Sequence, residues 1–394
     1  MIGHQTTDGP ALATLDPLAV ADTLVPEIAA GAEQTERDRR PSPSVVARLA
    51  ENGLFAMGVP REIGGLATDA ATMLRVIERL ATADASTGWC VAIGATAGLV
   101  YGFQPAIGRD AYEPDPGIVT CGVFHPRGQA RRVPGGYRVT GRWPFASGCQ
   151  IADWMSCGAV VVDETAAPNN SGPTIATVVF PATDMGIIDT WDVSGLRGSG
   201  SHDIELDDVF VPDVRVGSPP LAHRPGLGAL YAFPALGLAA LAVSAVSLGI
   251  AASAIETFTS LAIAKTPTAS RRRLAERGVI QSEVAQATSL LRSARAYFYA
   301  AVDEAWQQAS ADEAMSTDVR TNLRLAATRA TANSAQAVDA MYTAGGGTSN
   351  FSSSPLQRCF RDVHAITQHI SVAPTTWELC GRFLLGLDTD DSAL

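Results

Sequence analysis

An uncharged stretch from position 231 to 255 constrains the fold more than any other part of the sequence. It reads YAFPALGLAALAVSAVSLGIAASAI, and its length would permit a transmembrane helix. Most of its residues are alanine, glycine or serine, however, and such small side chains suit close helix packing better than contact with lipid. Neither an aromatic belt nor a positive cluster flanks it. We therefore predict a buried helix at the centre of a bundle or of a subunit interface, with no association with a membrane.

The whole chain divides into three regions that differ in the spacing of apolar residues. Residues 1–117 carry apolar side chains at three- and four-residue spacing, which predicts helices. Residues 118–222 contain short alternating or β-branched runs between glycine-rich turns, which predicts an antiparallel barrel or sandwich. Residues 223–394 return to long helical patterns. We predict an α+β fold with an N-terminal helical domain, a central antiparallel β domain and a C-terminal four-helix bundle.

The composition excludes several classes of function. The formal net charge of −11 argues against a nucleic-acid partner, because no face of the protein could neutralise many phosphates. The six cysteines form no CxxC pair, and their spacing suits neither a disulfide framework nor a zinc site. Residues 1–16 lack the basic and apolar segments of a signal peptide. Together these features predict a cytoplasmic protein.

Two of the six histidines lie in one short segment, RCFRDVHAITQHI at 358–370. His364 and His369 are five positions apart, which separates them by about 140° around a helix. Zinc-binding histidines on a helix sit four positions apart on one face, so this pair is no metal motif. Each histidine is instead a general base or a structural side chain. For His364 we favour a structural role that braces the helix or a subunit contact.

An aromatic segment, GRWPFASGCQIADW at 141–154, contains a candidate surface for a planar cofactor. If the segment is a strand, Trp143, Phe145 and Ser147 point to the same face. This arrangement would place a flat apolar wall beside a hydroxyl group, which suits a heteroaromatic ring that stacks and makes one hydrogen bond. The alternative is a strand that packs its aromatic side chains into the core.

Two glycine-rich segments are further candidates for ligand contact. In GLRGSGS at 195–201, backbone N–H groups and Arg197 could hold a phosphate, or the segment is a simple turn. It has no strand–loop–helix context, so it is no Rossmann or P-loop site. In GGGTSN at 345–350, small residues between two predicted helices allow a ligand to approach the backbone closely.

Taken together, the three regions and four motifs resemble the acyl-CoA dehydrogenase superfamily over nearly the whole chain. The motifs are STGW at 86–89, GRWPFASG at 141–148, GLRGSGS at 195–201 and QRCFRDVHAITQH at 357–369. Within the superfamily, the chain most resembles the oxygenase component of two-component flavin-dependent (group D) monooxygenases, and among these the steroid-derived phenol hydroxylases.

This resemblance implies an enzyme with a flavin and a partner protein. A separate flavin reductase would supply reduced flavin, which forms a C4a-hydroperoxyflavin with oxygen. That species would hydroxylate a phenolic or similar electron-rich small molecule. The resemblance, together with the uncharged stretch, also implies a homotetramer.

The main alternative within the superfamily is a true acyl-CoA dehydrogenase, whose reaction needs a carboxylate base. In most dehydrogenases a glutamate follows the Arg-Asp of the last helix by eight positions, and here that position is Ile370. Some relatives keep the glutamate on the first bundle helix, but no acid occurs between Asp213 and Glu256. Three alternatives stay open: a dehydrogenase-like flavoenzyme, an amine or sulfur oxygenase, and a non-catalytic flavin-binding scaffold.

The resemblance also implies roles for individual residues. His369 would be the general base that deprotonates a phenol. Ser147 would lie near flavin N5 and C4a and stabilise the hydroperoxide, and His125 is a candidate substrate contact. The implied flavin-binding residues are Trp89, Gly122, Val123, Phe124, Phe145, Ala146, Ser147, Gly347, Thr348, His369 and Ile370.

The choice of flavin rests on one departure from the dehydrogenase pattern. The usual pyrophosphate anchor after the first bundle helix, Arg-x-Phe-Gly, is replaced by AKTPTASRRR at 264–273. We therefore favour FMN as the cofactor, with FAD as the alternative. An arginine from a neighbouring subunit is expected to bind the flavin phosphate, and the sequence does not assign it.

Overall fold

The computed structural model describes residues 16–112, 114–115, 117–163, 173–219, 226–268, 270–311, 314–392 and 394. The prediction that a signal peptide is absent concerns residues 1–16. Of these residues, only Asp16 belongs to the described part of the chain. The predicted boundary between residues 222 and 223 also lies outside it. The domain limits therefore stay a prediction.

The N-terminal region is helical, as its apolar spacing predicts. Asp69 and Asp84 cap successive helices by accepting backbone N–H bonds from residues three positions on, which satisfies donors that the first turn leaves free. The elements are α1 (Pro17–Asp38), α2 (Pro43–Glu51), η2 (Leu54–Ala56), η3 (Arg61–Ile63), α3 (Ala70–Ala83), α4 (Ala85–Ala97), α5 (Leu99–Phe103) and α6 (Pro105–Tyr112).

The central region forms one seven-stranded sheet in the order β5-β6-β2-β1-β3-β4-β7. Its strands are β1 (Thr120–Val133), β2 (Gly136–Ala146), β3 (Trp154–Val162), β4 (Ile175–Pro181), β5 (Gly186–Ile188), β6 (His202–Pro212) and β7 (Val216–Gly217). The short helical turns η4 (Ala182–Asp184), η5 (Arg197–Ser199) and η6 (Asp213–Arg215) connect strands of this region.

The prediction of a purely antiparallel β domain is wrong, because β1 and β3 pair in parallel. After the β1–β2 hairpin, the chain leaves β2 at the end of the sheet where β1 begins. A short connection then crosses to the other side of β1, so that Trp154 of β3 pairs with Thr120 of β1. Because β3 starts at the same end as β1, the two strands run in the same direction and the sheet is mixed.

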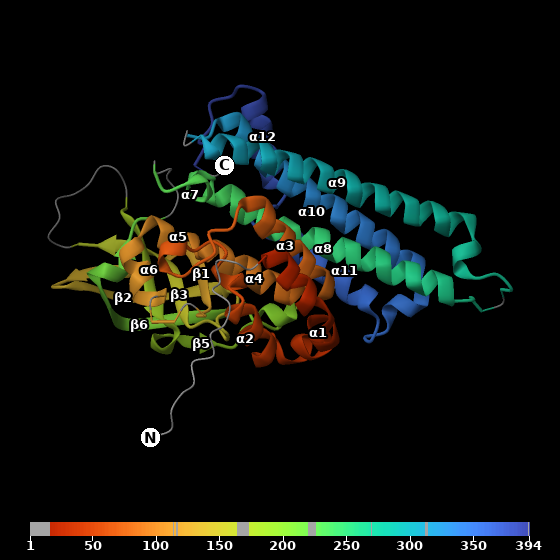
Figure 1. The fold of residues 1–394 in the computed structure, drawn as a ribbon, viewed down its shortest axis with the longest axis horizontal. Coiled ribbons are helices and arrows are strands. Elements are labelled where there is room, and N and C mark those ends of the chain that lie inside the picture. The colour runs from red at the N-terminus through yellow and green to blue at the C-terminus, as the bar shows by residue number, and fades with distance from the viewer. Residues whose placement is uncertain are drawn as a thin grey trace, which may run out of the picture.

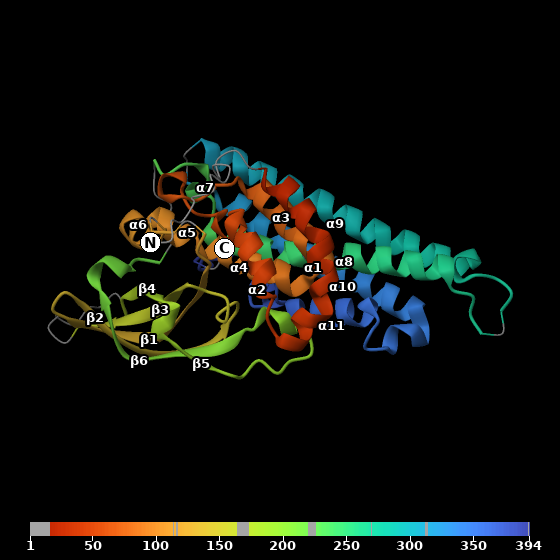
Figure 2. The ribbon, with the colours of Figure 1, turned by 60° about the horizontal axis from the view of Figure 1, so that its bottom comes forward.

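The C-terminal region contains the long helices. Its elements are α7 (Ala229–Ala232), α8 (Ala235–Ala264), η7 (Leu274–Glu276), α9 (Gly278–Ser310), α10 (Thr317–Gly345), η8 (Gly346–Asn350), α11 (Pro355–Thr367) and α12 (Thr375–Leu384). Figures 1 and 2 show helices α1, α3 and α4 between the sheet and the long helices of the bundle.

Helix α8 contains most of the uncharged stretch and lies in the core of the protein. It contacts α3, α4, α9, α10 and α11. By length and hydropathy α8 could cross a membrane, but 78% of its most apolar 18-residue window is buried inside the protein. The prediction of a buried bundle helix is therefore confirmed.

Helix α4 is the element where the three regions meet. It contacts β1 of the sheet, the turn η5 before β6, and both α8 and α11 of the bundle. A side chain on α4 can therefore touch the end of a strand on one side and the end of a bundle helix on the other.

Candidate active site

Three of the predicted site residues come together beside α4. The indole Nε1–H of Trp89, on α4, donates a hydrogen bond of 2.9 Å to Ser147 Oγ, just after β2. The ring of His369, just after α11, lies edge-on to the Trp89 ring, with ring centroids 5.4 Å apart. Trp89 and Ser147 are both buried. The structure thus places a hydroxyl, an indole and an imidazole from three distant parts of the chain in one cluster.

The predicted shared face of Trp143, Phe145 and Ser147 is wrong. Trp143 is fully buried, and its Nε1–H donates to the carbonyl of Gly158 at 2.7 Å. Phe145 instead is 70% exposed and has a φ of 62°. This left-handed backbone and a register shift between Trp143 and Ala146 break the alternation of the strand. Of the two predicted aromatic rings, only the ring of Phe145 is therefore exposed for stacking against a planar cofactor.

Ser147 is one end of a chain of hydroxyl groups. Its Oγ lies 2.7 Å from Ser201 Oγ, which lies 2.8 Å from Ser199 Oγ. Ser199 Oγ donates a 2.7 Å hydrogen bond to the carbonyl oxygen of Leu196. All three serines are buried, so the bonds are shielded from water.

The loop that contains Leu196, at the end of this series of hydroxyl groups, is hydrogen-bonded to α11, the helix that precedes His369. The backbone N–H of Leu196 donates a 2.7 Å bond to Asp362 Oδ1. A side chain at Gly195 would place its Cβ 2.1 Å from the carbonyl oxygen of Arg361, so only glycine permits this approach. Burial raises the pKa of Asp362 to about 7, against the opposing effect of the Leu196 N–H bond. The contact between the 195–201 loop and α11 therefore positions both the hydroxyl chain and the segment that carries His369.

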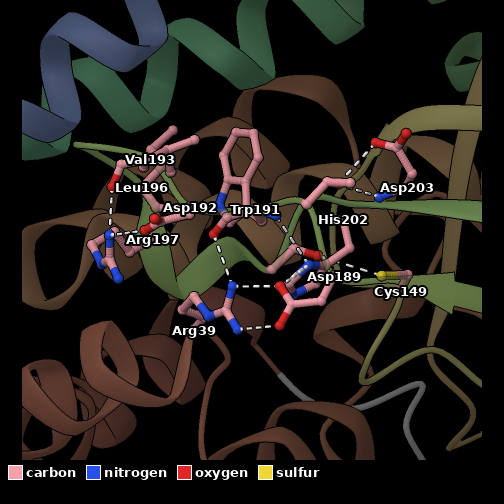
Figure 3. A network of polar contacts seen from close by, with 12 residues as sticks. Arg39, Cys149, Asp189, Trp191, Asp192, Val193, Leu196, Arg197, His202 and Asp203 are labelled. Atoms are coloured by element: carbon pink, nitrogen blue, oxygen red, sulfur yellow. Dashed lines mark hydrogen bonds and ion pairs between the residues drawn. The ribbon is translucent and has the colours of Figure 1, made fainter.

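Figure 3 shows a second network that holds the other side of the same loop. The guanidinium of Arg39 donates two bonds, of 2.6 and 2.7 Å, to the carboxylate of Asp189. The backbone N–H of Trp191 donates to Nδ1 of buried His202 at 3.2 Å. Burial lowers the pKa of His202, and the nearby Asp189 opposes this effect. The ring of Trp191 in turn lies edge-on to the exposed ring of Phe145.

Arg197, the predicted candidate for a phosphate contact, is already engaged within its own loop. Its Nη1 donates to the carbonyl of Val193 at 2.6 Å and to Asp192 Oδ1 at 3.2 Å, as Figure 3 shows. These contacts favour the interpretation of GLRGSGS as a turn.

The imidazole of His369 is neutral near pH 7. Burial, with a smaller contribution from the positive charge of Arg324, lowers its pKa to about 4. The backbone N–H of Ser371 donates to Nδ1 at 3.3 Å. Because this bond occupies the Nδ1 lone pair, the neutral ring carries its proton on Nε2.

Several predicted flavin contacts are exposed apolar side chains. Phe145 and Ile370 are 70% and 81% exposed, and Phe124 is also exposed. Phe124 and His125 lie in β1 at a register shift, where the pairing with β3 is interrupted. A Cβ at Gly122 would lie 2.9 Å from the Phe124 ring, so the glycine lets that ring fold over the strand. Exposed apolar rings and a buried hydroxyl at the edge are the features that an isoalloxazine ring requires, so the residues fit a flavin.

Three predicted contacts are not part of this cluster. Ala146 is fully buried and offers no surface to a cofactor. Gly347 and Thr348 lie in η8, before α11, whereas His369 follows α11; the 13 residues of that helix span about 20 Å. Thr348 Oγ1 instead accepts a 2.6 Å bond from Lys265, the single lysine of the sequence.

The sequence reasoning missed Ser199, Ser201 and Asp362. The two serines stand two positions apart in a glycine-rich loop whose motif points to its backbone N–H groups and to Arg197. Two hydroxyls in such a loop are a signal, but their partner Ser147 lies 54 positions from Ser201. Asp362 belongs to the Arg-Asp pair of the last motif, and no local pattern signals its bond to the distant Leu196 N–H.

Comparison with known proteins agrees with this architecture. Residues 18–104 match the family described as acyl-CoA dehydrogenase, N-terminal domain, and residues 241–374 match acyl-CoA dehydrogenase, C-terminal domain. The chain is 32% identical over 359 residues to the indole-3-acetate monooxygenase of Pseudomonas putida, covering 89% of each chain. It is 33% identical over 385 residues to the FADH(2)-dependent resorcinol hydroxylase, oxygenase component, of Rhizobium sp. (strain MTP-10005), covering 91% of each.

A solved structure shows the same fold over almost the full length. The crystal structure of the HsaA monooxygenase from M. tuberculosis matches with a TM-score of 0.87 at 28% identity, covering 96% of this chain and 99% of that chain. The predicted α+β fold of the acyl-CoA dehydrogenase type is confirmed, with a mixed sheet in place of an antiparallel one. The chain belongs to the acyl-CoA dehydrogenase superfamily, and within it to the oxygenase components of two-component flavin-dependent monooxygenases.

Proposed function

We propose that this oxygenase component hydroxylates an electron-rich aromatic small molecule of the phenol or indole class. The observation that carries the proposal is the contact of Trp89 with both Ser147 and His369. Apolar side chains next to these two residues in the chain, Phe145 and Ile370, are exposed. Two relatives support the substrate class, because their names specify indole-3-acetate and resorcinol. Both of those compounds contain electron-rich rings, which favour electrophilic oxygen transfer.

The cofactor of such a component is reduced flavin, which a separate reductase supplies. When bound, reduced flavin would supply the two electrons that activate dioxygen, so that one oxygen atom enters the product and the other leaves as water. The residues of the chain position the reacting groups and move protons. Ser147 is proposed to make a hydrogen bond to the edge of the flavin ring, and the Trp89 indole holds that hydroxyl in place.

His369 is proposed to accept the proton of the substrate's hydroxyl or ring N–H group. Loss of this proton raises the electron density of the ring carbon that receives oxygen. In the tautomer that the structure favours, the basic atom is Nδ1, so the substrate proton displaces the long bond from the Ser371 N–H. The low pKa keeps the ring unprotonated near pH 7, and it also makes the ring a weaker base than a histidine with a near-neutral pKa.

An acyl-CoA dehydrogenase reaction has no suitable base among the described residues of the cluster. The position beside His369 is Ile370, which cannot accept a proton. The carboxylates of Asp84 and Asp362 are buried, and each accepts bonds from backbone N–H groups. A carboxylate held in this way is a structural anchor of α4 or of the serine loop.

Turnover with a panel of substrates tests the proposed function. With reductase, reduced flavin and oxygen, we expect hydroxylated products from phenols or indoles and little product from thioethers or amines. Product identity is measured by chromatography with mass spectrometry. Preferred oxidation of a thioether or amine would contradict the substrate class. Absence of any product, with normal flavin binding, would favour the non-catalytic scaffold.

Flavin preference is a separate prediction. We expect tighter binding of reduced FMN than of reduced FAD, because the pyrophosphate anchor of the dehydrogenases is replaced at 264–273. The name of the resorcinol hydroxylase specifies FADH(2), which supports the opposite preference. Anaerobic titration with both reduced flavins measures the two dissociation constants. A clear preference for FAD would contradict the argument from the missing anchor.

The homotetramer and the cytoplasmic location stay predictions. The separation of Gly347 and Thr348 from His369 supports an oligomer, because another copy of the chain could bring this glycine loop to the proposed flavin site. The same arrangement would allow an arginine of a neighbouring copy to reach the flavin phosphate.

A further inference from the structure

The hydroxyl chain behind Ser147 has a defined direction of donation. A carbonyl oxygen only accepts, so the hydrogen of Ser199 is the one that bonds to Leu196. A serine hydroxyl has a single hydrogen, so the bond between Ser199 and Ser201 must be donated by Ser201. By the same count, the bond between Ser201 and Ser147 must be donated by Ser147.

This direction leaves Ser147 without a hydrogen for a ligand. Its single hydrogen bonds to Ser201, and one of its two lone pairs accepts the Nε1–H of Trp89. The remaining lone pair is the only free hydrogen-bonding capacity of the hydroxyl. Toward the proposed flavin surface, Ser147 is therefore an acceptor and not a donor.

Reversing the chain is possible but unfavourable. All three hydroxyls would have to turn together, and the hydrogen bond from Ser199 Oγ to the carbonyl of Leu196 would be lost. That carbonyl would keep two donors, the backbone N–H of Ser199 at 3.0 Å and the indole Nε1–H of Trp191 at 3.1 Å, so the chain as a whole would have one hydrogen bond fewer. The cost is thus about one net hydrogen bond in a buried site.

We propose that Ser199 and Ser201 are positioning residues that make Ser147 select reduced over oxidised flavin. This inference rests on the proposed contact between Ser147 and the edge of the flavin ring. Reduced flavin carries a hydrogen on N5, which the free lone pair of Ser147 can accept. Oxidised flavin has only a lone pair on N5, so two acceptors would face each other without a hydrogen between them. An enzyme that receives reduced flavin from a reductase and must release oxidised flavin benefits from this preference.

The test compares the dissociation constants of oxidised and reduced flavin in four proteins: the wild type, Ser201→Ala, Ser199→Ala and the control Ser218→Ala. Ser218 is an exposed serine that follows β7, whereas Ser199 and Ser201 are buried and precede β6. In Ser201→Ala the hydrogen of Ser147 loses its acceptor and becomes free to bond to N5 of oxidised flavin. In Ser199→Ala the hydrogen of Ser201 loses its acceptor, so Ser201 can donate to Ser147 and release the hydrogen of Ser147 in the same way.

We expect the ratio of the oxidised to the reduced dissociation constant to fall roughly three- to tenfold in both variants and to stay at the wild-type value in Ser218→Ala. Should the wild type bind no measurable oxidised flavin, a gain of binding in the variants is the expected result. Ser199→Ala is decisive because it leaves Ser147 and its neighbour Ser201 in place, and it carries the test alone if Ser201→Ala does not fold. A loss of packing would weaken both redox forms equally and leave the ratio unchanged.

The outcomes separate this inference from the proposed function. An unchanged ratio in Ser199→Ala, with tight binding of reduced flavin, would overturn the role of the serine chain and leave the oxygenase proposal intact. Failure of the wild type to bind flavin of either redox state would overturn both.

Discussion

Replacing His369 with alanine is expected to reduce product formation on the order of a hundred- to ten-thousand-fold, while reduced flavin is still oxidised. The variant loses the group that removes the substrate's proton. The substrate's ring carbon therefore stays weakly nucleophilic and reacts slowly with electrophilic oxygen. The oxygen that is consumed should then appear as hydrogen peroxide. Parallel assays of product, flavin oxidation and peroxide measure this change in coupling.

The matched control for this experiment is His364→Ala on the same segment. His364 Nε2 lies 2.9 Å from Asp339 Oδ1, and its ring lies against Phe360, so it braces α11 against α10. This variant should lose some stability and keep its ratio of product to peroxide. Wild-type coupling in His369→Ala would refute the assignment of His369 as the base.

The pH dependence of product formation gives a second readout for His369. A pKa lowered to about 4 means that the neutral, proton-accepting ring dominates at any pH above about 5. Product formation by the wild type should therefore stay level between about pH 5.5 and pH 8. A histidine base with an ordinary pKa near 6.5 would instead lose activity as the pH falls through that value. Such a loss, if it persists in His364→Ala, would contradict the buried, neutral state of His369.

Adding a single methyl group to Gly249 is expected to destabilise the protein by about 3 kcal/mol. Gly249 lies in the uncharged part of helix α8, where a Cβ would stand 2.4 Å from the carbonyl oxygen of Glu78 and 2.7 Å from Ala81 Cβ, both on α3. The nearest of these atoms belongs to the backbone, which cannot move aside without shifting the helix. Thermal unfolding of Gly249→Ala should therefore occur several degrees below that of the wild type.

The control for Gly249→Ala is the same substitution at Gly31. Gly31 lies in α1, and a Cβ there would meet no atom within 4 Å. Alanine is favoured over glycine inside a helix by roughly 1 kcal/mol, so Gly31→Ala should raise the unfolding temperature slightly. Equal melting temperatures for the two variants would refute the close packing of α8 on α3.

Local patterns in the sequence were sufficient for the layout of the fold. The uncharged stretch predicted the buried helix α8, because a helix without charges has no face that favours water. Apolar spacing similarly predicted the helical, β and helical regions in order. The parallel pairing of β1 with β3 was not predictable, because it depends on which side of β1 the chain crosses after β2.

The sequence by itself also determined the types of residue at the site, through motifs that resemble those of flavin monooxygenases. Only the tertiary structure decided how these residues are arranged. The alternation rule placed Trp143 and Phe145 on one face, but the left-handed backbone of Phe145 turned one ring to the surface and left the other in the core. The donor direction of the serine chain depends on contacts between Ser147 and a loop more than fifty positions away. Hydrogen bonds between distant segments depend on the packing of the sheet against α4 and α11, and no local spacing of residues specifies that packing.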